Sequence, residues 1–518
     1  MGRGAASLRT LGLVAAATVI LLVPAVLHGR PFLFFDSEHY FLIGRAILGA
    51  VQGLVGLETA SVGGPAATVS AALPPPEDGG SEGRLAVIAG GRSPVYALLL
   101  HGLTVSAGIW SVAILQATIC AWLIVRTCDL GLGQRQAGVT LAVVAALTGL
   151  TPLGFHVSFL MPDIFAGIGV LALLLLAFDA RAGMGERLVH AGLVALSLTM
   201  HTTILLLAVG VFILFLLTLA SRPLAAAIVP GSRALSALAI AAALAVQVGY
   251  PLAAERATGS RPNSPPFLTA RVIADGPGAR HLSETCTGAA DPYAACAFAD
   301  RAYADHNDVL WGHAGTTPDF IGMDRATQAA IQAEEMTFVR HAVAAHMPAQ
   351  AAASARNALF QFLAVGITEL QQQSTARIQL DPTWSGSAIL DHAPGLQACR
   401  ADPAACRPET ASGVRWHVLI LAVTLTATLA FYVRLAAICL PTGLRRRTPR
   451  ILLMGALPDG TPGLRLTCLM VVVGLVLIAN AVLCGVLSGV HDRYQARLAW
   501  LAPLLLLALV QRRPNQLV

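Results

Sequence analysis

Long apolar runs recur along most of this 518-residue chain, and they constrain its fold more than any other feature. A helix of about 20 apolar residues is long enough to cross the hydrocarbon core of a bilayer. Only 12% of the residues are charged, whereas an average soluble domain has about a quarter. The sequence therefore predicts an all-α polytopic membrane protein, and it excludes an ordinary soluble domain and a disordered chain.

Apolar length and flanking charge predict ten membrane-spanning helices. The first, 8–27, has Arg3 and Arg9 at its N-terminal end and is longer than the core of a signal peptide, which has about 7 to 15 residues. We therefore expect it to be an uncleaved span. The other predicted spans are 108–125, 137–154, 162–178, 188–200, 202–220, 234–251, 415–437, 464–488 and 498–511.

The arginines of the short loops predict the orientation, because positive charge gathers on the cytoplasmic side of a membrane protein. With ten crossings, the following residues share one side: Arg126, Arg135, Arg181, Arg187, Arg222, Arg233, Arg445, Arg446, Arg447, Arg450, Arg512 and Arg513. The N- and C-termini are then cytoplasmic. Residues 94–107 are apolar but short, so we expect a re-entrant or interfacial helix on the outer face. Residues 188–220 alternatively form one bent span plus a half span, since His201 interrupts them.

This topology predicts three parts. An N-terminal transmembrane body, 1–251, includes a first outer loop, 29–107, with a helix near 38–50 and a flexible Gly/Ala/Pro-rich insertion at 61–83. An outer (periplasmic), mostly helical soluble domain, 252–412, has expected helices near 265–275, 325–347 and 350–372. The C-terminal transmembrane helices lie within 413–518.

Four of the nine cysteines fall in the predicted outer domain as two close pairs, Cys286 with Cys296 and Cys399 with Cys406. In an oxidising compartment this pattern favours two local disulfides. Four unrelated thiols are the alternative. A zinc site is disfavoured, because neither pair has C-x-x-C spacing or a neighbouring histidine. The formal net charge of +6 is dispersed, so nucleic acid is not an expected partner.

Ionisable residues at the predicted membrane edges are the candidate site residues, because charge near hydrocarbon costs several kcal/mol unless it is paired or used. The segment "FFDSEHYF" places Asp36 and Glu38 directly after the first span, followed by Tyr40. A carboxylate here can act as general base towards an acceptor hydroxyl. The alternative is a structural one, in which Asp36 or Ser37 is the N-cap of the following helix.

Asp163, in "MPDIFAG", begins a predicted span that faces the same side. It either satisfies the first turn of that helix, or shares acid and base roles or a divalent cation with Asp36. Arg493 and Arg497 lie four residues apart, hence on one helix face, and arginine binds phosphate oxygens. With Tyr494 they alternatively form an interfacial anchor. His156 and His201 lie near the same boundary, where a lone histidine is more often structural.

Four motifs, "FFDSEHY", "RSPVYALLL", "MPDIFAG" and "DRYQARLAWLAPLLLL", resemble the GT-C superfamily of integral-membrane glycosyltransferases, which includes protein O-mannosyltransferases and the aminoarabinose transferases of lipid A. The likeness covers about 1–250 and 415–511. Many relatives have adjacent Asp and Glu where this sequence has Asp36-Ser37-Glu38.

The resemblance implies that a sugar moves from a polyprenyl-phosphate-linked donor to a glycan, lipid or protein acceptor at the outer face of a bacterial cytoplasmic membrane. Asp36 would be the catalytic base, with Glu38 and Asp163 as further catalytic candidates and Arg493 and Arg497 on the donor phosphate. We expect the substrate to be lined by Tyr40, Tyr96, His156, His201 and Tyr494. The candidate cofactor is a divalent cation, and the sequence does not identify its ligands.

Two other classes of function are alternatives for a polytopic membrane protein of this kind. A transporter or lipid flippase has many spans, but its polar sites lie near the bilayer midplane between repeats, whereas the candidate residues cluster at one surface. A catalytically idle scaffold would use the outer domain to bind a cell-wall partner. The sequence lacks the phosphate-loop, H-E-x-x-H and G-x-S-x-G motifs of soluble enzymes.

Overall fold

The computed structural model describes residues 3–55, 91–132, 136–258, 264–288, 291–299, 301–312, 319–369, 412–439 and 460–510, together with Ile389 and His392. Within these ranges the protein is built from helices, with one isolated β-bridge and no strand. The all-α prediction is confirmed for this part of the chain. Several sequence predictions lie outside it: the insertion 61–83, the pair Cys399 and Cys406, and Arg135, Arg445, Arg446, Arg447, Arg450, Arg512 and Arg513.

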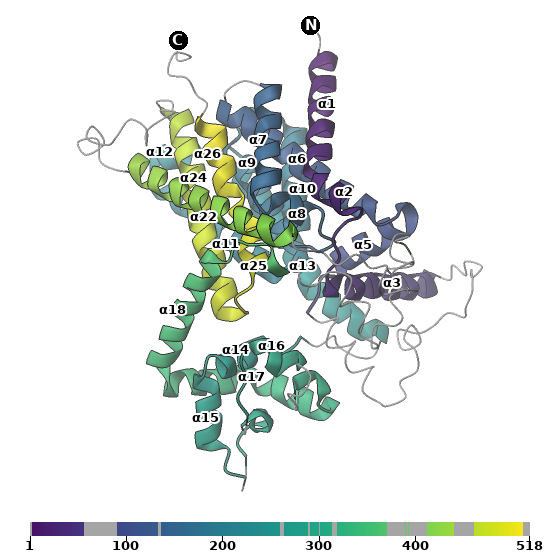
Figure 1. The fold of residues 1–518 in the computed structure, drawn as a ribbon, viewed down its shortest axis with the longest axis vertical. Helices are drawn as coiled ribbons and strands as arrows, with labels where there is room; N and C mark the ends of the chain where they lie inside the picture. The colour runs from purple at the N-terminus through teal and green to yellow at the C-terminus, as the bar shows by residue number, and fades with distance from the viewer. Residues whose placement is uncertain are drawn as a thin grey trace.

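Most of the helices lie in one body, in which many of the long ones run roughly parallel, and a second group of helices lies beyond one end of it (Figure 1). The body contains α1 (Arg3–Leu21), α2 (Val23–His28), α3 (Phe35–Val55), α5 (Pro94–Ala107), α6 (Trp110–Leu132), α7 (Ala137–Leu150), α8 (Leu153–Val157), α9 (Ile164–Phe178), α10 (Met184–Met200), α11 (Thr202–Leu217), α12 (Arg222–Ala227), α13 (Ser232–Thr258), α22 (Ser412–Cys439), α24 (Thr461–Leu487), α25 (Asp492–Ala499) and α26 (Leu501–Val510). The second group contains α14 (Phe267–Ala274), α15 (Pro277–Thr285), α16 (His306–Trp311) and α17 (Arg325–Ala345). The helix α18 (Met347–Leu363) connects the two.

Five helices of the described chain are long and apolar enough to cross a membrane. They cover Trp110–Gly131, Thr202–Ala220, Ser232–Arg256, Trp416–Cys439 and Gly463–Leu487, and each matches a predicted span. Helices α7 and α9 have 14 and 15 residues, hence a length of about 21 to 23 Å at 1.5 Å per residue, against about 30 Å of hydrocarbon. By length, the described helices therefore support a multi-span membrane protein without reaching ten full crossings.

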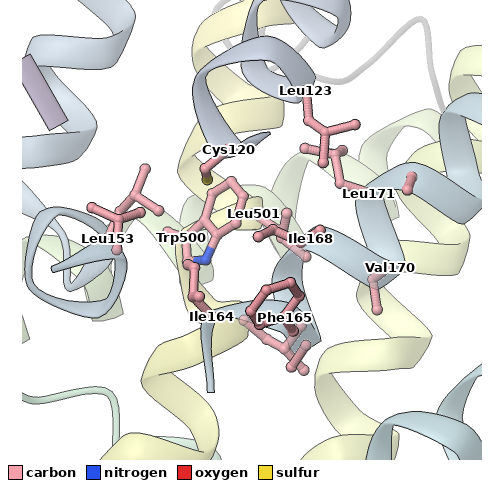
Figure 2. Packing of buried hydrophobic residues seen from close by; sticks show 14 of the residues in the cluster. Cys120, Leu123, Leu153, Ile164, Phe165, Ile168, Val170, Leu171, Trp500 and Leu501 are labelled. Carbon is pink, nitrogen blue, oxygen red and sulfur yellow. The ribbon is translucent and has the colours of Figure 1, made fainter. Parts of the chain in front are cut away.

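Burial explains why α9 tolerates its short length. Every residue of α9 is buried, so protein and not lipid surrounds it. Figure 2 shows the indole of the fully buried Trp500 among Ile164, Leu153 and Cys120, at the centre of this packing. Helix α13 is the opposite case. Only 17% of its most apolar 18-residue stretch is buried inside the protein, as expected for a helix that faces lipid.

Two predicted spans are interrupted. The expected helix 8–27 divides at Leu22, because Pro24 lacks a backbone N–H and suits only the first turn of a new helix, α2. The expected span 498–511 divides at Trp500, between α25 and α26. His201 has an extended backbone, with φ −160° and ψ 137°, and separates α10 from α11. Residues 188–220 are therefore two helices, as in the first of the two readings of the sequence.

The expected helix near 38–50 is longer than predicted. It is α3, which lies crosswise to α1 at the end of the body (Figure 1). The apolar segment 94–107 is the separate 14-residue helix α5, whose N-cap Ser93 accepts a hydrogen bond from the Tyr96 amide at 3.1 Å. Both helices start close to charged residues of the candidate site.

Helices α14 to α17 enclose a second hydrophobic core, which includes Ala270, Leu282, Phe320 and Phe338. The helices expected near 265–275, 325–347 and 350–372 are α14, α17 and α18. Cys286 and Cys296 form the predicted disulfide, with a Cα–Cα distance of 5.6 Å. This core touches the body at Gly489, where an added Cβ would lie 2.0 Å from His306 Cε1, so only glycine allows this approach.

Candidate functional site

The first turn of α3 is held beside the segment that leads into α9. The Phe32 amide donates a hydrogen bond to the Ser158 carbonyl at 2.9 Å, and the Leu160 amide donates to the Phe32 carbonyl at 2.9 Å. The Ser37 hydroxyl donates to the Leu160 carbonyl at 2.9 Å. These bonds place the acidic residues that follow each segment at the same end of the helical body.

Asp36 lies within the first turn of α3, which begins at Phe35, so neither Asp36 nor Ser37 is an N-cap. Its carboxylate pairs with Arg92 and lies 3.8 Å from Arg493 Nη1. Burial raises the pKa of Asp36, but Arg92, a hydrogen bond with His39 and the charge of Arg493 together hold that pKa well below its usual value. Asp36 is therefore ionised, and it is a weak base while Arg92 remains paired with it.

Arg493, near the start of α25, is a planar cation held between two acids. Its Nη1 faces Asp36, and its Nε lies 3.5 Å from Glu369 Oε2. Its guanidinium carbon lies 4.5 Å from the centre of the Phe34 ring and 5.0 Å from that of Tyr494. Its Nη2 donates to the Tyr494 hydroxyl at 3.3 Å, whereas Nε and Nη1 make no hydrogen bond within the described residues. Arg493 thus keeps donors for a further acceptor.

Arg497 is placed differently, although it lies one turn further along α25. It is fully buried, and its Nη1 lies 3.4 Å from Asp163 Oδ1. Its Nη2 donates to Thr203 Oγ1 at 3.0 Å and to Asn480 Oδ1 at 3.3 Å. These contacts fasten α25 to α9, α11 and α24. Nη1 and Nη2 of Arg497 thus join helices, whereas its Nε has no hydrogen-bond partner among the described residues. These contacts do not support the expectation that Arg497 shares a phosphate with Arg493.

Asp163 stands at the N-terminal end of α9, but its side chain accepts no hydrogen bond from the first turn of that helix. Asp163 therefore occupies the N-cap position of α9 without the side-chain hydrogen bond that the structural alternative expects. The carboxylate is buried and faces Arg497 instead, which makes it a structural ion pair next to the Asp36 and Arg493 pair.

Glu38 is not beside Asp36 in space. Its side chain is buried and its Oε2 accepts a hydrogen bond from the Ile389 amide at 3.1 Å. Residues two apart on a helix point to different sides, so Glu38 and Asp36 serve different contacts.

Two of the three tyrosines predicted to line the substrate are packing residues. Tyr40 and Tyr96 are buried, with ring centres 5.1 Å apart in an edge-to-face arrangement. The Tyr96 hydroxyl donates to Gln116 Oε1 at 3.2 Å. Because that bond satisfies the hydroxyl inside the protein, Tyr96 has a structural explanation.

The predicted histidines differ from one another. His201 Nδ1 accepts a hydrogen bond from the Thr203 amide at 3.2 Å and caps α11, which is the structural alternative. Its ring centre lies 6.4 Å from that of Tyr494. His156 is fully buried, and both of its ring nitrogens lack a hydrogen-bond partner in the described chain.

A divalent cation needs several converging ligands. Among the described residues, one set of three metal-ligand residues has its ligand atoms within 4.8 Å of one another. It consists of Cys286, Asp291 and Cys296, beside helices α14 to α17. Its two cysteines are joined in the disulfide, which removes their thiolates as ligands. Asp36 and Asp163 do not belong to such a group.

Two charged residues of the site were missed in the sequence. Arg92 pairs with Asp36, although a long Gly/Pro-rich stretch separates them in the chain. Glu369 Oε1 accepts hydrogen bonds from His491 Nδ1 at 2.9 Å and from the Asp492 amide at 3.1 Å, and its other oxygen faces Arg493. The only signal for Arg92 was its position directly before the apolar segment 94–107.

The site therefore joins three carboxylates, Asp36, Asp163 and Glu369, with three guanidinium groups at one end of a helical body. No family model, no curated protein and no solved structure matches this chain. What the site does is inferred from its own chemistry.

Proposed function

We propose that the protein is a membrane glycosyltransferase of the GT-C type, which moves a sugar from a polyprenyl-phosphate-linked donor to an acceptor hydroxyl. The observation that carries the proposal is the placement of Asp36 against Arg493, whose donors Nε and Nη1 are without a hydrogen bond within the described residues. Transfer from a lipid phosphate needs a base for the attacking hydroxyl and a cation for the departing phosphate. This pair supplies one of each.

In the proposed step, Asp36 accepts the proton of the acceptor hydroxyl. The acceptor oxygen forms a bond with the anomeric carbon of the sugar, while the bond from that carbon to the phosphate oxygen breaks. The electron pair of the broken bond leaves with the polyprenyl phosphate, whose added negative charge faces Arg493. The proton remains on Asp36 until solvent removes it.

The pairing of Arg92 with Asp36 means that the donor binds before Asp36 acts as a base. In the resting protein, Arg92 and Arg493 both neutralise Asp36. A donor phosphate competes for the same two guanidinium groups, since both bind oxygen anions in the same way. Loss of the Arg92 pairing raises the pKa of Asp36 towards the range of a working base. In this proposal, Asp36 becomes an effective base only once the donor is bound.

The orientation supports an outer site. Helix α9 starts beside Asp163 and ends at Asp179, which accepts a hydrogen bond from Arg126 at 2.9 Å. Arg181 and Arg187 follow at the same end. Positive charge next to spans marks the cytoplasmic side, so the Asp36 end would face outward from the cytoplasmic membrane.

The test uses the purified full-length protein in proteoliposomes, with a polyprenyl-phosphate donor labelled in its sugar and membrane extract as the acceptor source. Asp36→Asn keeps the size of the side chain but removes the base, and we expect turnover to fall by ~10²-fold to 10⁴-fold. Glu284→Gln, in an exposed ion pair far from the site, is the matched control. Turnover near that of the wild type in Asp36→Asn would overturn the proposal. Donor movement without covalent change would replace it with transport by a flippase.

A further inference from the structure

His156 is a buried polar side chain that the structure leaves without a partner. It lies on α8, in the connection between the predicted spans 137–154 and 162–178, and it is 0% exposed. Neither Nδ1 nor Nε2 makes a hydrogen bond with any described residue. A buried polar group left unsatisfied costs about 1 to 3 kcal/mol, so such a group calls for a specific explanation.

The backbone around His156 is fixed. Its amide donates to the Pro152 carbonyl at 3.0 Å. Gln116 Nε2, from α6, donates to the carbonyls of Val157 at 3.1 Å and of Phe159 at 2.9 Å. The ring of Phe159 stands edge-on to the imidazole, with the centres 6.3 Å apart. Movement of this segment to find the ring a partner would break these bonds.

The imidazole lies next to the candidate site. Phe159, which stands edge-on to the imidazole, also stands edge-on to Phe34, with ring centres 5.5 Å apart. The guanidinium carbon of Arg493 lies 4.5 Å from the centre of that Phe34 ring. The charged groups that act on the imidazole are Asp163, Arg497, Glu369 and Arg493. Burial is the largest influence and lowers the pKa of His156 to about 4. The ring is therefore neutral near pH 7, with one N–H that donates and one nitrogen that accepts.

We propose that His156 donates a hydrogen bond to the phosphate of the lipid-linked donor, which Arg493 also binds. This inference rests on the proposed function and adds a ligand-binding residue to it. A non-bridging phosphate oxygen is an acceptor with several lone pairs, so it can receive Arg493 and His156 together. The orphaned ring then has a partner in the bound state only.

The chain contains a matched control. His190, on α10, is also 0% exposed, and its two ring nitrogens also lack hydrogen-bond partners among the described residues. Its ring stacks on Trp122, with centres 4.8 Å apart, and the charges that act on it are Arg126 and Asp179. His190 therefore belongs to the opposite end of α9. Replacing either histidine removes the same buried polar atoms, but only His156 lies at the end of the helical body that holds Arg493.

The experiment measures thermal unfolding of the detergent-solubilised full chain with polyprenyl monophosphate, polyprenol or inorganic phosphate. For the wild type and His190→Phe, we expect polyprenyl monophosphate to raise the melting temperature to the same extent. For His156→Phe, we expect a melting temperature without ligand at or above that of the wild type. Its apparent Kd for polyprenyl monophosphate should rise by ~10-fold to 100-fold, the effect of one hydrogen bond to a charged group. His156→Gln, which keeps an N–H donor, should bind more tightly than His156→Ala, and this comparison serves if the Phe variant does not fold.

The outcomes separate the inference from the function. If His156→Phe binds polyprenyl monophosphate as the wild type does, the contact with His156 is wrong while the proposed function stands. If the wild type does not bind polyprenyl monophosphate, the proposed function fails and the inference fails with it. Stabilisation by inorganic phosphate that His156→Phe loses supports a contact with the phosphate group itself. Equal stabilisation by polyprenol overturns that contact, because polyprenol has no phosphate.

Discussion

Arg493 Nη1 lies 3.8 Å from Asp36 Oδ2, and each of the two residues occupies the second position of its helix, α25 and α3. The positive end of a helix dipole favours an acid such as Asp36 at this position and disfavours a cation such as Arg493. Asp36 and Glu369 offset that penalty for Arg493 in the resting protein. Because Asp36 and Glu369 neutralise Arg493 in the resting protein, an incoming anion has to compete with them for its donors.

The contact of α9 with α25 and Trp500 depends on a glycine. A Cβ at Gly167 would lie 2.6 Å from Trp500 Cζ2 and 2.9 Å from the Arg497 carbonyl oxygen. We predict that Gly167→Ala lowers the free energy of unfolding by about 1 to 3 kcal/mol, as overpacking does. Gly192→Ala, at a helical position with nothing within 4 Å, should leave stability unchanged or raise it. Thermal unfolding in detergent compares the two, and equal melting temperatures would contradict the packing described for α9.

The buried pair Asp163 and Arg497 should show strong coupling. Asp163→Asn leaves a buried guanidinium without its counter-charge, so we expect a loss of about 3 to 5 kcal/mol. Arg497→Gln leaves the opposite charge unpaired, and the double variant removes both charges. We therefore expect the double variant to be more stable than the sum of the single effects predicts, and denaturant unfolding measures this. Additive effects would show that the two groups do not interact.

The disulfide should stabilise the α14–α17 core. Cys286 and Cys296 are 10 residues apart. In the chain-entropy model, a disulfide that closes a loop of this length stabilises the folded state by about 3 kcal/mol. We predict that a reductant lowers the melting temperature of the wild type but not that of the Cys286→Ser/Cys296→Ser variant. Cys439→Ser, which replaces an exposed free thiol, is the control and should respond as the wild type does. A wild type insensitive to reductant would show that the bond does not contribute to stability.

His39 makes the stability of the folded protein depend on pH. Burial, with Arg92 as the next cause, lowers the pKa of His39 from 6.5 to about 4 in the folded protein. Because the folded state favours the neutral ring, stability is complete above about pH 6.5 and is lost progressively as the pH falls towards 4, by up to about 3 kcal/mol.

His39→Gln should flatten this part of the stability curve. Burial lowers the pKa of His306 and His281 as well, so the comparison is the difference between wild type and variant at each pH. Parallel curves from pH 7 to pH 4 would show that His39 titrates normally.

The sequence predicted the long helices well because their signal is local. Helices α6, α11, α13, α22 and α24 are apolar runs bounded by charge, which is the pattern of a helix that meets lipid. The breaks at Leu22 and Trp500 were missed because the residues next to each break, such as Val23 and Leu498, are apolar and continue the hydropathy signal across it. Hydropathy does not register a change of direction inside a buried segment.

The site was predicted in part for the same reason. Asp36 and Arg493 stand out because charge at the edge of an apolar run is rare. Arg92 and Glu369 were missed because their pairing depends on tertiary contacts between distant segments. The contact of Glu38 with the Ile389 amide was not predicted, because it joins segments that are far apart in the chain. The spacing of Arg493 and Arg497 correctly indicated one helix, but it could not show that burial gives them different partners.

The central claim, that Asp36 and Arg493 act together on one donor, is tested most directly by a double-variant cycle on sugar transfer. Asp36→Asn, Arg493→Gln and the double variant are compared with the wild type by release of polyprenyl phosphate in proteoliposomes. The account predicts that each single variant slows release by at least ~10²-fold and that the double variant is about as slow as the slower single one, because groups acting in one step are not additive. If the two effects multiply, or if either single variant releases polyprenyl phosphate at the wild-type rate, the two residues do not form one catalytic site.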